Sequence, residues 1–182
     1  MKKKSPHLNW ETIASKKGED LIIFNVRYDT VVNPMNDKQM KAVVLESNDA
    51  ANIIALTRNE QVLLARQYRF GTQTISLEIP GGFVDEGEEH QQAAQRELEE
   101  ETGFTADEWE YLGFSYANPV FMNSKVHHWV ARNAERTNDL SLDRGEAIEL
   151  LIYPLSEVKT MLNDGIIAHP HTIAAFARFF KF

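Results

Sequence analysis

Apolar and polar residues alternate along the chain in short runs that predict strands, with helical patterns in three places. Runs of β-branched and aromatic residues bounded by Asn, Pro and Gly are typical of strands. Good helix formers that end at a glycine, as in residues 88–102 before Gly103, are typical of a helix. The pattern predicts strands at residues 21–32, 40–47, 53–56, 62–68, 75–80, 109–116, 126–133 and 147–154, and helices at residues 88–102, 155–164 and 171–182. Residues 1–20 are polar and are expected to be loosely held.

The order of these elements predicts the fold class. Strands come first, then a helix, more strands and two final helices, so strand and helix do not alternate as they do in a doubly wound sheet. We therefore expect an α+β fold, an α/β/α sandwich with a mixed sheet between helices. The early strands predict a small N-terminal β-rich subdomain at residues 1–47, followed by the main domain at residues 48–182.

Composition restricts the class of protein. Hydrophobic residues make up 43% of the chain, which is enough to form a core. The absence of cysteine excludes a disulfide framework, a thiolate zinc site and a cysteine nucleophile. The basic start, MKKKSPHLNW, is followed by no apolar segment, and no run reaches the roughly 18 apolar residues of a membrane span. We expect a cytoplasmic protein without a membrane segment.

The negative charge is concentrated in one segment. The net charge is −8, and residues 82–104, GFVDEGEEHQQAAQRELEEETGF, contain eight acidic residues and one basic residue. Outside this segment 19 acidic residues are balanced by 18 basic ones. We therefore expect a local cation site, and no nucleic-acid binding, which requires a basic surface.

Three carboxylates of this segment share one side of the predicted helix. At 100° per residue, Glu97, Glu100 and Glu101 fall within an arc of about 100°, and Glu99 points away. Like charges at these spacings repel each other unless they are solvated or a divalent cation lies among them. Oxygen ligands of this kind suit Mg²⁺ or Mn²⁺.

Two glycines and an arginine flank the acidic turn. Gly81 and Gly82 allow a backbone shape that could direct a carbonyl at the same ion. Arg96 can hold Glu88 in a bidentate pair. From Gly82 to Phe104 the spacing Gly-x5-Glu-x7-Arg-Glu-Leu-x-Glu-Glu-x-Gly-Phe resembles the signature of the Nudix hydrolases at every position.

The resemblance implies a fold, a reaction and a set of site residues. Nudix hydrolases split a pyrophosphate bond in a nucleoside diphosphate joined to a further group, and their mixed sheet lies between helices. By position, Glu97 and Glu101 are implied as principal Mg²⁺ ligands, Glu100 as a further ligand and catalytic residue, and the Gly81 carbonyl as another ligand. Mn²⁺ can replace Mg²⁺ in this role. The implied structural positions of the signature are Gly82, Glu88, Arg96 and Gly103.

Segments outside the signature narrow the substrate class. RQYR (residues 66–69) and LEIPGG (residues 77–82) resemble the ADP-ribose and nucleoside diphosphate sugar pyrophosphatases, and imply substrate contacts from Arg66, Arg69 and Glu78. Pro119 also resembles that group. The following Val-Phe-Met-Asn departs from its usual glycine and acidic residue, so other sugar nucleotides such as GDP-mannose remain candidates beside ADP-ribose. The products would be a nucleoside monophosphate and a sugar phosphate.

The resemblance also implies a catalytic glutamate in the loop before the last strand. That loop reads DLSLDRGEAIE, at residues 139–149. Glu146 is the first choice as general base, and Glu149 and Asp143 are the alternatives. Glu149 lies between Ile148 and Leu150 in a predicted strand, where it could instead be structural.

The remaining histidines and aromatic residues are interpreted as structural. Adjacent strand residues face opposite ways, so neighbouring histidines in a strand do not converge on a metal. The residues interpreted in this way are His127 and His128 in a strand, His169 and His171 as capping or surface groups, and Trp129, Phe121 and Tyr28 in the core. The sequence does not specify which aromatic residue stacks on the base of the substrate.

Two features concern partners and alternatives. Members of the resembled group commonly form homodimers through N-terminal strands, so residues 1–47 are expected to support dimerisation or strand exchange.

A dinucleoside polyphosphate or RNA 5′-end pyrophosphohydrolase is one alternative function, which the low basic content disfavours. A non-catalytic sugar-nucleotide sensor is another, which the intact signature disfavours.

Overall fold

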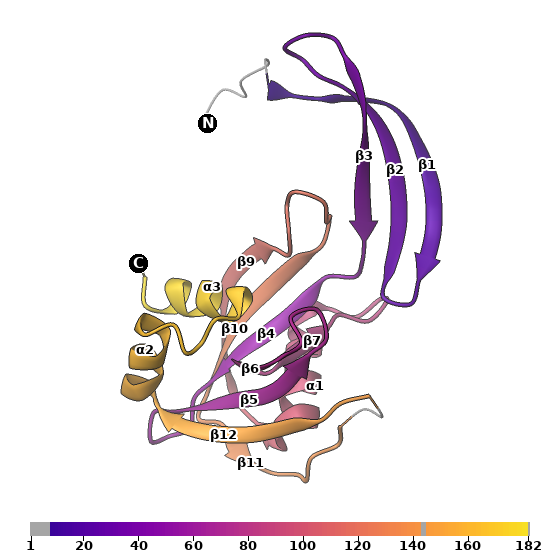
Figure 1. Cartoon of the computed structure of the whole chain (residues 1–182). Coiled ribbons are helices and arrows are strands. Elements are labelled where there is room, and N and C mark those ends of the chain that lie inside the picture. The colour runs from indigo at the N-terminus through magenta and orange to yellow at the C-terminus, as the bar shows by residue number, and fades with distance from the viewer. Residues whose placement is uncertain (1–7, 143–144, 182) are drawn as a thin grey trace. The chain divides into compact units, whose positions relative to one another are not determined.

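A computed structural model describes residues 8–142 and 145–181, and the chain divides into two compact units (Figure 1). Unit 1 comprises the described residues up to Ser47 together with Tyr116–Ser124. Unit 2 comprises Asn48–Ser115 and the described residues from Lys125 onward. The sequence pattern does not indicate that the 116–124 loop belongs with the N-terminal strands.

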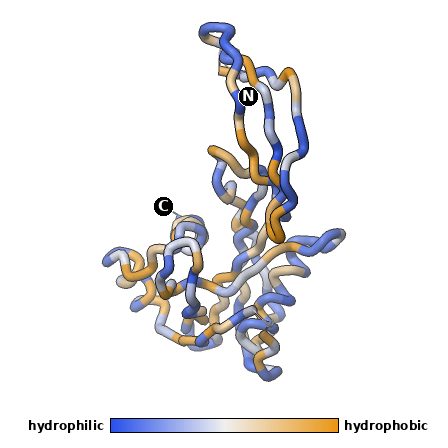
Figure 2. The backbone as a smooth tube through the Cα atoms, turned by 45° about the vertical axis from the view of Figure 1, so that its right-hand side comes forward, coloured by the Kyte–Doolittle hydropathy of each residue, from blue (hydrophilic) through white to orange (hydrophobic). Residues whose placement is uncertain are grey.

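Unit 1 contains an antiparallel three-stranded sheet. Its strands are β1 (Glu11–Leu21), β2 (Phe24–Val32) and β3 (Gln39–Glu46), in the order β1-β2-β3. The N–H of Leu45 donates to the Phe121 carbonyl at 2.8 Å and so attaches the 116–124 loop to β3. The turn between β2 and β3 is hydrophilic, and the strands of unit 1 carry short hydrophobic stretches separated by hydrophilic ones (Figure 2).

The prediction that residues 1–20 are loosely held is wrong for β1. The predicted strand at residues 21–32 is also interrupted, because Ile22 and Ile23 form a turn and Leu21 pairs with Phe24. β1 is exposed along most of its length. β1 is stabilised by backbone hydrogen bonds to β2 and not by burial of its side chains. The sequence of such a strand has no periodic hydrophobic pattern from which it could be predicted.

Unit 2 contains the remaining strands and all three helices of the described chain. Its elements are β4 (Ala50–Ala55), β5 (Gln61–Arg69), β6 (Thr74–Glu78), β7 (Gly81–Phe83), α1 (His90–Thr102), β8 (Phe104–Thr105), β9 (Glu108–Tyr116), β10 (Lys125–Arg132), β11 (Glu135–Arg136), β12 (Ile148–Pro154), α2 (Leu155–Asn163) and α3 (Pro170–Phe179). The antiparallel hairpin strands β5 and β6 join β12 in a sheet of order β12-β5-β6. A mixed sheet has the order β7-β4-β10-β9, with β4 and β10 parallel.

Neighbouring residues of β4 contribute to two separate cores. Ile53 belongs to a buried cluster with Leu98 of α1, and Ile54 belongs to a second cluster with Val158 of α2 and Phe176 of α3. The helices therefore cover opposite faces of the strands (Figure 1). This arrangement confirms the predicted α+β class, with a mixed sheet between helices and an N-terminal β subdomain.

Some predictions of burial differ from the structure. Trp129 is in the core, at 6% exposure, whereas Phe121 and Tyr28 are 40% and 37% exposed. Both exposed residues belong to unit 1, whose thin sheet buries few side chains. Among the described residues, no helix has the length and apolarity needed to cross a membrane.

Candidate active site

The turn into β7 fits closely around two glycines. Gly81 and Gly82 pair with Asn52 and Ala51 of β4. A Cβ at Gly81, where φ is 156°, would meet the backbone of those two residues, and a Cβ at Gly82 would meet the carboxylate of Glu97. Glycine is required at both positions because a strand and a helix carboxylate occupy the space of a side chain.

The ends of α1 are defined by local contacts that set the orientation of its acidic turn. The N–H of Glu89 donates to the side chain of Gln92 at 3.2 Å. At the other end Gly103 adopts a left-handed conformation with φ of 72°, and its N–H donates to the Glu99 carbonyl at 2.8 Å. A left-handed terminal residue of this type favours glycine and ends the helix there.

The carboxylates of α1 divide between an inner and an outer face, as the helical spacing predicts. Glu97 and Glu101 are buried, at 8% and 2% exposure. Glu100 is partly buried. Glu99 is exposed and accepts a hydrogen bond from the side chain of Asn138 at 2.6 Å. The buried pair therefore lies on the side of the helix that faces the rest of unit 2.

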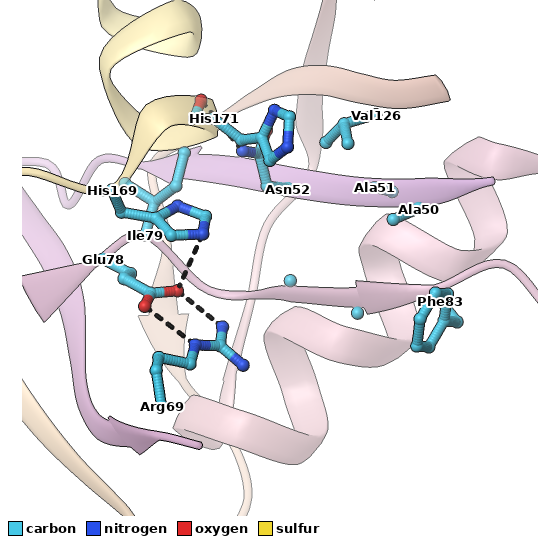
Figure 3. Close-up of a pocket in the computed structure, with 12 residues that line it drawn as sticks. Ala50, Ala51, Asn52, Arg69, Glu78, Ile79, Phe83, Val126, His169 and His171 are labelled. Atoms are coloured by element: carbon cyan, nitrogen blue, oxygen red, sulfur yellow. Dashed lines mark hydrogen bonds and ion pairs between the residues drawn. The ribbon is translucent and has the colours of Figure 1, made fainter. Parts of the chain in front are cut away.

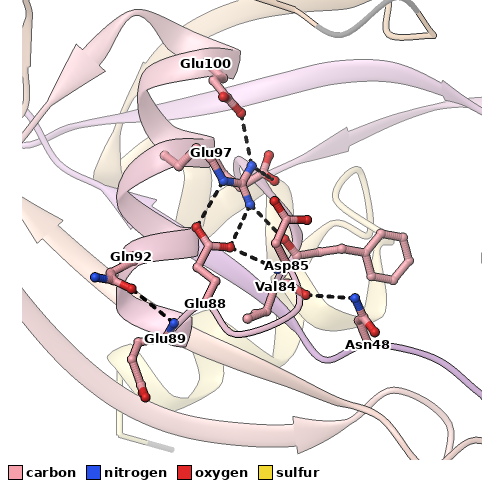
Figure 4. Close-up of polar contacts among 10 residues, drawn as sticks. Asn48, Val84, Asp85, Glu88, Glu89, Gln92, Glu97 and Glu100 are labelled. Atoms are coloured by element: carbon pink, nitrogen blue, oxygen red, sulfur yellow. Dashed lines mark hydrogen bonds and ion pairs between the residues drawn. The ribbon is translucent and has the colours of Figure 1, made fainter.

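Arg96 connects the acidic groups around the turn, and Figure 4 labels three of its partners, Glu88, Glu97 and Glu100. Its guanidinium donates to both carboxylate oxygens of Glu88 at 3.1 Å, to Glu97 at 2.7 Å and to Glu100 at 3.1 Å. It also donates to the Phe83 carbonyl at 3.0 Å, which holds β7 against the helix. The bond to Arg96 lowers the pKa of Glu88, and the same carboxylates raise the pKa of Arg96. The sequence predicted the pair with Glu88 but not the two further carboxylates.

The two inner carboxylates are costly to ionise where they lie. Burial raises the pKa of Glu101 to about 8, although the N–H of Gly81 donates to its carboxylate at 2.9 Å. Burial also raises the pKa of Glu97, against the opposing effect of Arg96. The charge of Glu146 contributes to both shifts. A cation among these groups would favour their charged forms.

An acid-lined cavity of about 450 Å³ lies beside this turn, and we call it the acidic cavity. In the described part of the chain, no three acidic or histidine side chains already converge as a metal site. Arg96 donates to Glu97 and Glu100, and the N–H of Gly81 donates to Glu101. The donor set nevertheless fits a hard divalent cation, since it consists of carboxylate oxygens and the pKa values of two of them, Glu97 and Glu101, are raised. The lining residues are Gln67, Arg69, Gly81, Gly82, Phe83, Asp85, Arg96, Glu97, Glu100, Glu101 and Glu146.

A second cavity of about 180 Å³ adjoins the first, and we call it the histidine cavity (Figure 3). Arg69 stands on the boundary, and donates to both oxygens of the buried Glu78 at 2.9 and 2.6 Å. Burial pushes the pKa of Glu78 upward, but Arg69 and His169 outweigh it and the pKa is lowered. The lining residues are Ala50, Ala51, Asn52, Arg69, Glu78, Ile79, Gly81, Gly82, Phe83, Val126, His169 and His171.

The structure separates the two arginines of the RQYR segment. Successive strand residues face opposite ways, so Arg69 lines both cavities, together with Gln67 in the acidic cavity. Arg66 points to the other face of β5 and forms an ion pair with Glu149, its partner across the β5–β12 ladder. Arg66 lines neither cavity.

The three candidate bases are also separated. Glu146 lines the acidic cavity. Glu149 is engaged with Arg66 on the other face, as the strand pattern suggested for a structural residue. Asp143 lies outside the described residues. The structure therefore brings Glu146 to the same cavity as Glu97 and Glu101.

Sequence reasoning missed several residues that line the histidine cavity. His169 occupies the N-cap position of α3, as predicted, but makes no side-chain cap bond, and both His169 and His171 are partly buried and line the cavity rather than the open surface. Phe83 is the aromatic residue that lines both cavities, and Asn52 was not considered. In the sequence, the only indication of these residues was the pair of histidines around Pro170, and this pair does not show where α3 packs.

Comparison with known proteins gives consistent results. The family model of the NUDIX domain matches residues 46–176. The chain is 30% identical over 155 residues to the ADP-ribose pyrophosphatase of Bacillus subtilis (strain 168), covering 85% of this chain and 80% of that protein. It is 29% identical over 154 residues to the methanol dehydrogenase activator of Bacillus methanolicus, covering 84% and 83%. A crystal structure of an ADP compounds hydrolase has the same fold, with a TM-score of 0.83 at 23% identity over 94% of this chain and 92% of that chain.

Proposed function

The chain belongs to the NUDIX domain family, and on this premise we propose that it hydrolyses the pyrophosphate bond of nucleoside diphosphate sugars, with ADP-ribose as the first candidate. The products are a nucleoside monophosphate and a sugar phosphate. The observation that carries the proposal is the acidic cavity, in which buried Glu97 and Glu101 lie beside Arg69 and Glu146.

The substrate class is supported by what surrounds the acidic cavity. Arg69 offers a positive charge at the junction of the two cavities, where a diphosphate group would meet it. The histidine cavity provides space next to that position for a group attached to the diphosphate. A relative with 30% identity is named an ADP-ribose pyrophosphatase, which makes ADP-ribose the first substrate to test.

The residues that would hold the divalent cation are Glu97 and Glu101, with Glu100 and the carbonyl of Gly81. Mg²⁺ is the proposed ion, and Mn²⁺ is its substitute. Such an ion, when bound, neutralises diphosphate charge and lowers the pKa of a water molecule. Arg96 maintains the position of the acidic turn through Glu88 and the Phe83 carbonyl.

Glu146 is the proposed general base. Its side chain lines the acidic cavity and is exposed, so it can reach a water molecule near the diphosphate. In this role Glu146 accepts the proton of the attacking water, a contribution that typically amounts to about 10²–10⁴-fold in rate. The resulting nucleophile attacks one phosphorus, and the bond from that phosphorus to the bridging oxygen breaks.

We also propose that unit 1 supports homodimerisation. Its sheet leaves several large apolar side chains exposed, among them Ile13, Ile22, Met40 and Val43. Exposed apolar groups gathered on one small unit are typical of an interaction surface. Light scattering should give twice the monomer mass of 20.8 kDa, and a monomer mass over the concentration range of the activity assay would reject the dimer.

A substrate panel tests the catalytic proposal. The protein is incubated with Mg²⁺ and ADP-ribose, GDP-mannose, a dinucleoside polyphosphate or a 5′-triphosphorylated RNA, and the products are separated by chromatography. We expect a nucleoside monophosphate from at least one sugar nucleotide, and no reaction in excess chelator. Cleavage of the dinucleoside polyphosphate or RNA alone would instead support the alternative pyrophosphohydrolases, and binding of a sugar nucleotide without cleavage would indicate a sensor.

A further inference from the structure

The histidine cavity is bordered by a chain of hydrogen bonds that the proposed reaction does not use. The chain begins at Asn52 on β4, passes through His128 on β10 and Ser115 on β9, and ends at His171 at the start of α3 (Figure 3 shows its two ends). All four residues belong to unit 2. The heavy-atom distances along the chain are 2.7, 3.0 and 3.4 Å.

The direction of each bond can be determined from one end of the chain. The Nδ2 group of Asn52 donates to the backbone carbonyl of His171 at 3.2 Å, so Oδ1 of Asn52 faces His128 as an acceptor. Nδ1 of His128 must therefore be the donor. In a neutral imidazole the other nitrogen is an acceptor, so Nε2 of His128 accepts from the hydroxyl of Ser115.

The same assignment of donors and acceptors determines the tautomer of His171. Because the hydroxyl proton of Ser115 is directed at His128, its oxygen can only accept from Nδ1–H of His171. Neutral His171 then carries a lone pair on Nε2. Among the described residues no hydrogen-bond partner of this Nε2 is found, and the atom is not one of the buried unsatisfied groups.

Burial supports the neutral state of both rings. It lowers the pKa of His128 to about 4, and Arg178 and the neighbouring histidines shift it in the same direction. Burial also lowers the pKa of His171, although the charge of Glu78 opposes the shift. Both imidazoles are therefore uncharged near neutral pH, as the sequence of donors and acceptors requires.

We propose that the histidine cavity binds the sugar ring directly attached to the diphosphate, and that Nε2 of His171 accepts a hydrogen bond from one of its hydroxyl groups. This inference rests on the proposed function, because it places the diphosphate in the acidic cavity. Ser115 acts as a positioning residue, which holds His171 in the accepting tautomer.

The connection between the cavities favours a sugar ring over a nucleobase. The two cavities share Arg69, Gly81, Gly82 and Phe83, so a group in the histidine cavity lies next to one in the acidic cavity. In a nucleoside diphosphate sugar, the groups next to the diphosphate are sugar rings, and the base is one ribose further away. A sugar hydroxyl is a donor suited to the lone pair on Nε2 of His171. Loss of this hydrogen bond in the bound state would leave the hydroxyl and the imidazole nitrogen buried and unpaired.

The tautomer and the contact can be measured without catalysis. Long-range ¹H–¹⁵N spectra of the metal-free protein distinguish the two ring nitrogens of His171, assigned by comparison with His171→Gln. We expect the Nδ1–H tautomer in the wild type, and a mixture of tautomers in Ser115→Ala. On addition of ADP-ribose or GDP-mannose the Nε2 resonance of His171 should shift, whereas pyrophosphate, which carries no sugar, should leave it unchanged.

Kinetics provide the second measurement. His171→Phe keeps a ring and removes the acceptor, and should reduce kcat/KM for sugar nucleotides by about 3- to 10-fold, mostly through KM. His171→Gln, which retains an acceptor, should recover part of the loss. His90→Phe is the matched control, because His90 lies outside both cavities, and should leave kcat/KM within about twofold.

The outcomes separate this inference from the proposed function. If the wild type cleaves sugar nucleotides but Nε2 of His171 does not respond to them, or His171→Phe matches the wild type, the inference is overturned and the function stands. If the wild type cleaves none of them yet Nε2 responds to the sugar nucleotides alone, the catalytic proposal fails and the sugar site stands. An Nε2–H tautomer in the free protein would also overturn the inference.

Discussion

The two cavities of unit 2 differ in how they are assembled. The main acidic groups of the acidic cavity come from one turn of α1, with Glu146 added from a loop. The histidine cavity combines residues from β4, β5, β6, β7, β10 and the start of α3. One cavity gathers negative charge, and the other is lined mainly by apolar groups and neutral imidazoles.

The difference indicates which part of the site supplies binding strength and which part supplies substrate selectivity. Charge in the acidic cavity suits the part that all substrates share, the diphosphate and its cation. Hydrogen-bond geometry in the histidine cavity suits the part in which substrates differ. Substitutions in the first cavity should therefore affect all substrates alike, and those in the second should affect them unequally.

The largest effect is expected for the inner carboxylates. Glu101→Gln or Glu97→Gln should lower kcat by on the order of 10³-fold or more for every sugar nucleotide, because each removes a charged ligand for the cation. Calorimetry with Mn²⁺ should show the corresponding loss of metal binding. Glu99→Gln is the control, since Glu99 lies on the outer face beside Asn138 and its change should be below about twofold. Equal effects at Glu99 and Glu101 would contradict the assignment.

A smaller effect is expected for the general base, and it should leave metal binding intact. Glu146→Gln should lower kcat by about 10²–10⁴-fold. Glu149→Gln provides the comparison, because Glu149 pairs with Arg66 away from the cavity and should retain nearly full activity. A rate for Glu146→Gln within about twofold of the wild type, measured with saturating Mg²⁺, would remove Glu146 from this role.

The junction between the cavities should show an intermediate effect on selectivity. Arg69→Lys keeps the charge but cannot donate the two parallel hydrogen bonds that the planar guanidinium makes to Glu78, so kcat/KM should fall by about 10-fold. The ratio of kcat/KM between ADP-ribose and GDP-mannose should change as well, since Arg69 lines both cavities. Arg66→Lys should change neither quantity by more than about twofold, and a larger response there would show that Arg66 contacts the substrate.

The smallest effect is a pH dependence of stability in the metal-free protein. The pKa of Glu101 is about 8 when folded and 4.5 ordinarily, so the folded state holds the proton more tightly and stability falls as pH rises towards 8. Buried histidines such as His128 change stability below about pH 6.5, so the window from pH 6.5 to 8 isolates the carboxyl group.

In this window the free energy of unfolding in chelator should decrease by about 2 kcal/mol. Denaturant titrations at several pH values provide the measurement. Glu101→Gln should abolish most of the slope, and Glu99→Gln should preserve it. Excess Mg²⁺ should reduce the slope in the wild type, because a bound cation favours the charged carboxylate. A slope that survives in Glu101→Gln would assign the effect to another group.

Features that depend on residues close along the chain can be predicted from the sequence. The phase of Glu97 and Glu101 on α1 follows from helical spacing, and the end of that helix follows from the left-handed conformation that Gly103 adopts. Arg96 and Glu88, which precedes α1, pair because they are close along the chain. The α+β class followed from the order of strands and helices. These relations are local, so they hold before the chain folds into its final arrangement.

Contacts between residues far apart along the chain are seen only in the folded structure. β1 has no periodic hydrophobic pattern, because it is stabilised by backbone pairing with β2 and not by burial of side chains. Arg66 and Arg69 lie on opposite faces of β5, because successive side chains of a strand alternate between its two faces. His171 reaches Ser115 across 56 residues, and Asn52 reaches the His171 carbonyl across 119. Such contacts arise when α3 docks against β4 and β10, and the spacing of residues along the chain does not encode that docking.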